Sequence, residues 1–435
     1  MHQATRWQHP RAALAALLAP LALACTAGIG ALATPGCGDE ACDGSCVPGH
    51  GTAGFGGAGT GATGLGAGGA GTGGAGAEAG SIPDAGPDAP PPPSYSFVVF
   101  GDNQFATASC TSGVPERLAV PEVVRSLAPT FVMHVGDLMD HGYEAGAYAK
   151  FVSCYQGMLS ELPLFPTSGN HDMGSGAILD YKTYLEGQLT TRNSAAYGAA
   201  YASDFAVTYE DDPNSYSTDP SNPGSTSDVP SGFSFKTYYS MRFKNAYVIS
   251  FEIGTHWWAD TPRSWLHQHL DEAHADPTID HIFVIMHHPL YSTHMQDSSS
   301  SGECIKPVRD EYEQLFRDHD VTVVFNGHVH LYEHFYVPDD GTPTHQSPPP
   351  ATYPHDGNAV HYITTGGGGG PTPNNCNPPP TPLQQVSYDY LQAGNCGYHV
   401  TRVQVEGKKL TVNVLEVSGD ASSQSTSSWD EFTIE

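Results

Sequence analysis

The sequence predicts an α/β fold for the region from Ser94 onward, and two features support this prediction. Apolar runs of strand length, such as SFVVF at Ser96–Phe100 and HIFVIM at His281–Met286, alternate with stretches of helical periodicity. Several of these runs end in Asp, Asn or His, and open α/β sheets carry their chemistry on the loops that follow strands. We therefore expect the functional residues to lie at strand ends.

Residues 1–24 have the pattern of an export signal. Two arginines precede an almost unbroken Ala/Leu run, Ala12–Ala24, so cleavage as a signal peptide is expected. Leu21–Cys25 also resembles a bacterial lipoprotein box, apart from Ala22, which makes a membrane tether through a lipidated Cys25 an alternative. A membrane-spanning anchor, which needs ~20 apolar residues, is a weaker third interpretation. All three predict a secreted, periplasmic or outer-surface protein.

Residues 25–93 are predicted to be a disordered tether, because Gly, Ala, Thr and Pro dominate and few side chains are large enough to bury. Residues 94–435 are then the folded domain. The chain of 435 residues has a net charge of −29 and only 17 Lys and Arg. We expect no nucleic-acid partner, since a phosphate backbone would be repelled.

The first part of the domain predicts a strand, helix, strand unit with an aspartate after each strand. Ser96–Phe100 runs into GDNQ at Gly101–Gln104, a helix is expected over Pro115–Leu127, and Phe131–Val135 runs into GDLMD. A third strand, Leu162–Thr167, leads to GNHD. Each of these loops contains residue types that bind metals.

Residues 174–232 are predicted to be an insert. They are rich in Ser, Tyr, Asp, Asn and Gly without clear periodicity, which indicates a lid, a binding insert or disorder. We interpret Tyr201, Tyr209 and Tyr216 as exposed loop aromatics, with the lining of a substrate pocket as the alternative.

The rest of the domain continues the alternation. Strands are expected at Ser234–Phe243 and Tyr247–Ile253 as a hairpin, at His281–Met286, Val321–Phe325 and Ala359–Thr364, and at Tyr398–Val405 and Lys409–Val417 as a closing hairpin. Helices are expected at Pro262–His274, capped by Thr261, and at Pro307–His319. The helical residues His267, His269 and His274 are predicted to be solvated. Five glycines at 366–370 lack the Lys of a P-loop and are predicted to be a flexible turn.

Five cysteines fall within the predicted domain, so at most two disulfides can form inside it. We prefer Cys376 with Cys396, because they flank a Pro-rich loop and closing about twenty residues would stabilise the fold by roughly 3 kcal/mol. The sequence leaves the connectivity of Cys110, Cys154 and Cys304 open.

Seven polar residues follow predicted strands in five separate loops: Asp102, Asp137, Asn170, His171, His287, His328 and His330. Two metal ions about 3.5–4 Å apart need a bridging carboxylate with oxygen and nitrogen ligands on each side, and this set supplies both. Each residue alone is also compatible with a helix cap or a packed histidine. Their recurrence at five strand ends favours a dinuclear metal centre.

The order GDNQ, GDLMD, GNHD, MHHP and GHVH, from Gly101 to His330, resembles the calcineurin-like metallophosphoesterase superfamily. GHVHLYEH at Gly327–His334 and HYITTGGGG at His361–Gly369 are similar to its purple acid phosphatase branch. The resemblance implies a four-layer α/β/β/α sandwich of two mixed sheets with helices outside.

The same resemblance implies a role for each residue. Two divalent or trivalent ions (Fe, Mn or Zn) would share Asp137, with Asp102 and His330 on one ion and Asn170, His287 and His328 on the other. His171 would bind the substrate phosphate and protonate the leaving oxygen, while the cations hold the developing charge. Asp137 and Asn170 would thus serve catalysis together with His171.

Two positions depart from the family pattern. The superfamily usually has His two residues after the first Asp, where this chain has Gln104. Purple acid phosphatases have a metal-binding Tyr three residues after the second Asp, where this chain has Asp140. Both side chains offer oxygen atoms, and Gln104 is kept as a candidate metal ligand.

Together these features predict an exported metal-dependent phosphoric ester hydrolase that acts on small phosphorylated substrates, above all phosphomonoesters. A phosphodiesterase is the alternative within enzymes. A surface-tethered binding protein with a degenerate site is the alternative outside them, and the absence of the usual His and Tyr keeps it open.

Overall fold

The computed structural model describes residues 91–105, 109–111, 113–142, 146–172, 190–210, 238–251, 263–295, 306–373 and 385–435. The predicted signal peptide, most of the predicted tether, the Thr261 cap and Tyr216 lie outside the described residues. Within the described ranges, no helix is long and apolar enough to cross a bilayer.

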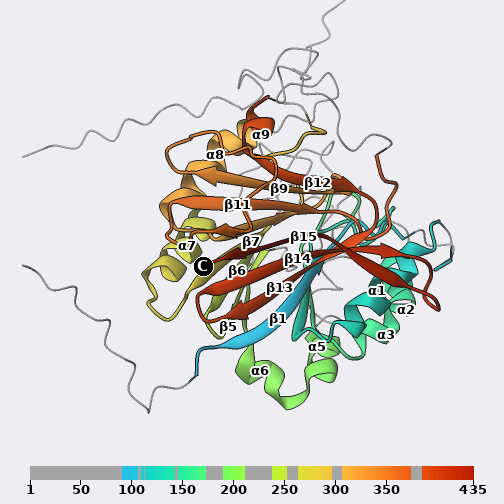
Figure 1. Cartoon of the computed structure of the whole chain (residues 1–435). Helices are drawn as coiled ribbons and strands as arrows, with labels where there is room; N and C mark the ends of the chain where they lie inside the picture. Colours follow the sequence, from blue (N-terminus) through green and yellow to red (C-terminus); the bar gives the residue numbers. More distant parts are fainter. Residues whose placement is uncertain are drawn as a thin grey trace, which may run out of the picture. The chain divides into compact units, whose positions relative to one another are not determined.

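Two mixed sheets form the centre of the domain (Figure 1). The first has the order β10 (Thr352–Tyr353), β15 (Ser425–Ile434), β14 (Lys409–Ser418), β13 (His399–Glu406), β1 (Ser94–Phe100), β2 (Phe131–His134) and β3 (Leu164–Pro166). The second has the order β12 (Leu391–Cys396), β9 (Leu331–Pro338), β11 (Ala359–Thr365), β8 (Val323–Asn326), β7 (His281–Ile285), β6 (Ala246–Ser250), β5 (Tyr238–Phe243) and β4 (Ala206–Glu210). In the first sheet, neighbouring strands are parallel from β1 to β3. In the second sheet, β6, β7, β8 and β11 are parallel. Within each set the carboxyl ends of the strands therefore lie at the same end of the sheet.

The sheets pack through an aromatic core. Phe97 of β1 lies edge-on to Phe283 of β7 with ring centroids 5.2 Å apart, and it stacks on Phe131 of β2. The next residues along β1, Val98 and Phe100, face the opposite way, as the strand period of two requires. Strands buried on both faces explain why the sequence shows continuous apolar runs instead of alternation.

Helices cover the outer faces of the sheets. On the first sheet lie α1 (Glu116–Ser126), α2 (Ala147–Cys154) and α3 (Gln156–Leu159), and on the second lie α7 (Arg263–Ala275) and α8 (Lys306–Asp318). Smaller helices are α5 (Thr190–Tyr197), η2 (Gly198–Ala200), α6 (Tyr201–Asp204) and α9 (Gln385–Tyr390). The predicted four-layer sandwich is therefore confirmed (Figure 1).

Five strands were not predicted from the sequence: β4, β9, β10, β12 and β15. β4 comes from the insert and forms an edge of the second sheet, β9 begins directly after the GHVH turn, and β15 follows the hairpin that was expected to close the domain. The sequence of β15, STSSWDEFTI, is mostly exposed and lacks an alternating apolar pattern. Strands of this kind are recognised only through the neighbour with which they pair.

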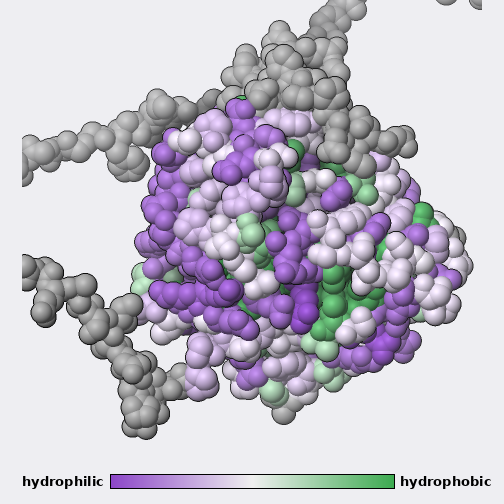
Figure 2. All heavy atoms as spheres, viewed as in Figure 1, coloured by the Kyte–Doolittle hydropathy of each residue, from purple (hydrophilic) through white to green (hydrophobic). Residues whose placement is uncertain are grey.

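Two solvent-exposure predictions were wrong. Tyr201 is buried, and its ring stacks on Phe165 with centroids 6.3 Å apart, because α6 places it against the end of β3. His269 is also buried, with Nδ1 2.6 Å from the Tyr247 hydroxyl, because it lies on the inner face of α7. His274, by contrast, is half exposed. Figure 2 shows that the visible outer surface is largely hydrophilic.

A disulfide joins Cys110 to Cys154, with Cα atoms 5.3 Å apart, and fastens the loop after Gln104 to the end of α2. Cys396 is also disulfide-bonded. Since Cys110 and Cys154 pair with each other, the partner of Cys396 lies outside the described residues, where Cys376 also lies. The preferred pair Cys376–Cys396 therefore stays a prediction.

Buried histidines predict that acid destabilises the fold. Desolvation lowers the pKa of His281 and His399 to about 4 and that of His334 to about 3. These rings are neutral in the fold but are protonated below about pH 6.5 in the unfolded chain. The stability they contribute is complete above about pH 6.5 and is lost as pH falls toward the folded-state values, by up to about 1.4 kcal/mol per histidine per pH unit.

Urea unfolding of the metal-free protein at pH 7 and pH 5 measures this loss. His334 stacks on Phe432 with centroids 4.2 Å apart, so His334→Phe can retain the ring contact. We expect this variant to lose less stability than the parent between the two pH values. An identical loss in both proteins would contradict the assignment.

Candidate metal centre

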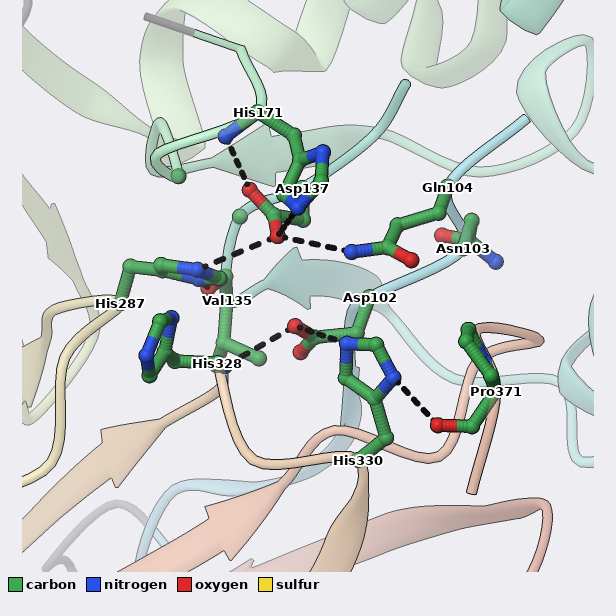
Figure 3. Close-up of polar contacts among 12 residues, drawn as sticks. Asp102, Asn103, Gln104, Val135, Asp137, His171, His287, His328, His330 and Pro371 are labelled. Atoms are coloured by element: carbon green, nitrogen blue, oxygen red, sulfur yellow. Dashed lines mark hydrogen bonds and ion pairs between the residues drawn. The ribbon is translucent and has the colours of Figure 1, made fainter. Parts of the chain in front are cut away.

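The predicted site residues converge at the carboxyl ends of five strands (Figure 3). Asp102 follows β1, Asp137 follows β2, Asn170 and His171 follow β3, His287 follows β7, and His328 and His330 follow β8. Gln104 lies beside them (Figure 3). The two sheets thus contribute jointly to one site.

Asp102, Asp137 and His330 form one group of donors, with ligand atoms all within 4.8 Å of one another. Both aspartates are fully buried, and Asp102 Oδ2 has no hydrogen-bond partner among the described residues. A buried carboxylate oxygen is costly without a compensating partner, so this atom fits a cation. His330 Nδ1 donates to the Pro371 carbonyl at 2.7 Å, which leaves Nε2 with a lone pair 3.5 Å from Asp102.

Asn170, His287 and His328 form a second group. Asn170 Oδ1 lies 3.0 Å from His287 Nε2 and 2.9 Å from His328 Nδ1. His287 Nδ1 donates to the Val135 carbonyl at 2.7 Å, so in the neutral ring, the form that binds a metal, Nε2 carries a lone pair. His287 Nε2 is 3.4 Å from Asp137 Oδ2, which places the Asp137 carboxylate between the two groups. The donor set fits two metal ions that share one carboxylate.

The environment of Asp137 keeps it ionised. Although burial raises the pKa of this carboxyl, the neighbouring His287 and His171 hold it well below its usual range. The His171 backbone N–H donates to Oδ1 at 2.9 Å, and the Gln104 amide donates to Oδ2 at 3.2 Å. Asp137 is therefore an anion held by several donors.

Gln104 and Asp140, the two residues that depart from the family pattern, have different surroundings. Gln104 turns its amide nitrogen, which cannot bind a metal, toward Asp137. A ligand role for Gln104 requires the amide to turn over, and it stays a prediction. Asp140 faces His171 instead of the donor groups: its carbonyl oxygen lies 2.6 Å and its Oδ1 3.5 Å from His171 Nδ1.

The loops that carry the donors have unusual backbone conformations. Asp102, Gln104, Asp137 and His328 have φ values of 59°, 47°, 54° and 67°, in the left-handed region. Non-glycine residues there cost on the order of 1–3 kcal/mol each and persist only when their surroundings hold them. Hydrogen bonds between the first two loops do so, since Asp102 N donates to Gly136 O at 2.9 Å and Gln104 N to Asp137 O at 3.0 Å.

A buried network behind the site was not identified from the sequence. His134 Nδ1 accepts from the Gly136 N–H at 3.2 Å, so its Nε2 carries the proton and donates to Asn103 Oδ1. Burial lowers the pKa of His134 to about 3 and keeps the ring neutral. The Asn103 amide in turn contacts Tyr155 Oη and donates to the Gly368 carbonyl at 2.8 Å. The only sequence signal was a polar residue inside the apolar run FVMHV.

The prediction that glycines 366–370 form a flexible turn was wrong. All five are buried, and Gly368 N and Gly370 N donate to the carbonyls of Gly101 and Asp102, both at 2.7 Å. Arg117 Nη2 donates to the Gly369 carbonyl at 2.8 Å. Because these residues have no side chains, the backbone can pack directly behind Asp102 and His330.

Asp172, the last residue of GNHD, fastens the third loop to the second. Its carboxylate accepts the backbone N–H groups of Gly169 at 3.0 Å, Leu138 at 3.2 Å and Met139 at 3.3 Å. Burial and the nearby Asp137 raise the pKa of this carboxyl to about 7. Asp172 therefore positions the site without belonging to either donor group.

These features define the class of protein: a two-sheet α/β sandwich with a candidate dinuclear metal centre at its strand ends. The model of the calcineurin-like phosphoesterase family matches residues 95–332, more than half of the chain. The chain therefore belongs to the calcineurin-like phosphoesterase family, which confirms the predicted resemblance.

The chain is similar to two purple acid phosphatases, one by sequence and one by fold. Over 97 residues the chain is 33% identical to Fe(3+)-Zn(2+) purple acid phosphatase 12 of Arabidopsis thaliana. The aligned segment covers 22% of this chain and 20% of that protein. The structure of purple acid phosphatase PPD1 from yellow lupin (Lupinus luteus) has a TM-score of 0.54 at 18% identity, covering 79% of this chain and 54% of that one. The chain thus aligns with a fifth of the curated relative and about half of the lupin structure.

Gly169 provides a test of how closely the site is packed. A Cβ there would lie 2.1 Å from Asp137 Oδ1, so Gly169→Ala must displace the shared carboxylate. We expect this variant to lose most of its tightly bound metal, measured by elemental analysis, while circular dichroism shows a folded protein. Gly157→Ala is the matched control, because its Cβ would meet no atom closer than 3.5 Å. Unchanged metal content in Gly169→Ala would exclude this packing.

Proposed function

We propose that the domain hydrolyses phosphomonoesters. The observation that carries this proposal is the arrangement of two donor groups around Asp137, with His171 beside the same carboxylate. When bound, two cations supply positive charge that orients the ester phosphate and stabilises the charge developing on it. Asp102 and His330 would hold one cation, and Asn170, His287 and His328 the other.

His171 is the residue placed to handle a proton. Its Nδ1 faces the Asp140 carbonyl, which can only accept, so Nδ1 carries a hydrogen and the ring orientation is set. The other nitrogen, Nε2, lies 4.0 Å from Asp137 Oδ2. The side chain is 36% exposed, so Nε2 is accessible to a substrate. In the imidazolium form Nε2 also carries a hydrogen, and we assign to this Nε2–H group the binding of phosphate and the protonation of the leaving oxygen.

Metal content of the purified domain, measured with turnover of one generic monoester and one generic diester, tests the proposal. Two metals with faster monoester turnover support it. Faster diester turnover would make the protein a phosphodiesterase. Bound metals without turnover of either ester would indicate a degenerate binding site.

Two substitutions should separate chemistry from metal binding. His287→Ala removes a donor and should lower metal content, with partial rescue of activity by added metal. His171→Ala should keep its metals and lose on the order of 10²–10⁴ in rate for esters of poorly acidic alcohols. Esters of acidic phenols need less protonation and should be affected less. Equal slowing of both ester types would leave His171 with phosphate binding only.

We also propose that the protein is exported and loses residues 1–24, on the basis of the Ala/Leu run after two arginines. Mass spectrometry of the exported protein should find a mature N-terminus at Cys25. If Cys25 is lipidated, Cys25→Ser should release the protein from membranes, whereas unchanged fractionation would favour ordinary secretion. An intact Met1 on exported protein would contradict cleavage.

A further inference from the structure

The loops that carry His287 and His328 are held together by one buried side chain, Asn326. This residue ends β8 and is 1% exposed. Its Nδ2 donates to the Met286 carbonyl at 3.0 Å and to the His288 carbonyl at 3.1 Å. Carbonyl oxygens only accept hydrogen bonds, so the amide nitrogen must face them, and both of its hydrogens are used.

Backbone hydrogen bonds complete the attachment around His287. Gly327 N donates to the His287 carbonyl at 2.9 Å, so three successive carbonyls, those of residues 286–288, accept from Asn326 or Gly327. In the other direction, Met286 N donates to the Phe325 carbonyl at 3.1 Å. The backbone on both sides of His287 is therefore fixed to the end of β8.

The turn that follows Asn326 contacts both donor groups. His328 N donates to Asp102 Oδ1 at 2.9 Å, and a Cβ on Gly327 would lie 2.5 Å from Asp102 Oδ2. The rings of His287 and His328 lie next to each other, with centroids 5.3 Å apart (Figure 3). A displacement of the loop after β7 relative to this turn would separate two donors of the same group.

Stability alone does not explain an asparagine at this position. The preceding residues of β8, Val323, Val324 and Phe325, are apolar and fully buried, and Asn is depleted in strands. Asn326 Oδ1 is also buried and has no hydrogen-bond partner among the described residues. A buried acceptor without a partner is unfavourable. What the side chain supplies is two donors directed at the backbone around His287.

We propose that Asn326 is a positioning residue for the metal centre, which holds the backbone of His287 so that its Nε2 meets the other donors. This nitrogen lies 3.0 Å from Asn170 Oδ1 and 3.4 Å from Asp137 Oδ2. The Val135 carbonyl orients the imidazole ring, whereas Asn326 fixes the backbone that carries it. The proposal rests on the metal-binding part of the proposed function and not on which ester is hydrolysed.

Isothermal titration of the mature, metal-free chain with Zn²⁺ tests the proposal. The parent should bind two ions. Asn326→Ala should weaken the binding of one ion on the order of tenfold, as is typical for groups that support metal ligands, and leave the other within about threefold. Unchanged affinity for both ions in the folded variant would overturn the proposal. A parent that binds no Zn²⁺ would overturn the metal centre itself, and this proposal with it.

Asn245→Ala is the matched control, because Asn245 is an equally buried asparagine at the amino end of β6, far along the strands from the donors. Its Nδ2 donates to the Gly407 carbonyl and to Asp280 Oδ2, both at 2.9 Å, and its Oδ1 has no partner within the described ranges. We expect Asn245→Ala to be less stable to urea but to keep both Zn²⁺ affinities within about twofold. An equal loss of Zn²⁺ affinity in this control would show that any weakened fold binds metal poorly, contrary to the proposal.

Asn326→Leu provides a second variant, since leucine has a similar branched shape and lacks both donors. With Co²⁺ in place of Zn²⁺, the visible absorption of the bound ion reports the geometry of its ligands. We expect the Co²⁺ spectrum to change in Asn326→Leu and to stay the same in Asn245→Ala. A parent-like spectrum in folded Asn326→Leu would overturn the proposal. Loss of the fold in both Asn326 variants, seen by circular dichroism, would also overturn it, because Asn326 would then serve the fold alone.

Discussion

The structure depends on the burial of Asp102 and Asp137 where the two sheets meet. Both carboxylates are fully buried, and one Asp102 oxygen has no partner among the described residues. Burying such charges is unfavourable unless they are paired, so the surroundings supply backbone N–H groups and the Gln104 amide as donors. The same arrangement leaves lone pairs available for cations. The buried carboxylates therefore affect both the stability of the fold and the candidate metal site.

Close packing makes this arrangement specific. Four site residues have left-handed backbone conformations, and glycines on neighbouring loops let the chain approach within contact of the carboxylates. The buried His134 and Asn103 link the first two loops, while Asp172 links the second and third. The donor loops are therefore fastened to one another by residues outside the two donor groups, as precise sites generally require.

The net charge of −29 sets a condition on the proposed catalysis. An acidic protein repels a phosphate ester at long range, so the proposed catalysis requires cations to reverse the local field at the metal centre.

The sequence by itself determined most strands, the helices α1, α7 and α8, and the order of the donor loops, because apolar runs and Asp, Asn and His at strand ends are local signals. It also determined the family, through five ordered motifs. Only the tertiary structure decided that Asp140 faces His171, that glycines 366–370 pack behind Asp102, and that β4, β9 and β15 complete the sheets. These features depend on contacts between residues far apart in the chain. The sequence does not distinguish a polar strand from a loop, or a buried glycine run from an exposed one. It also does not show which way the Asp140 carboxylate turns, because that depends on neighbours far away in the chain.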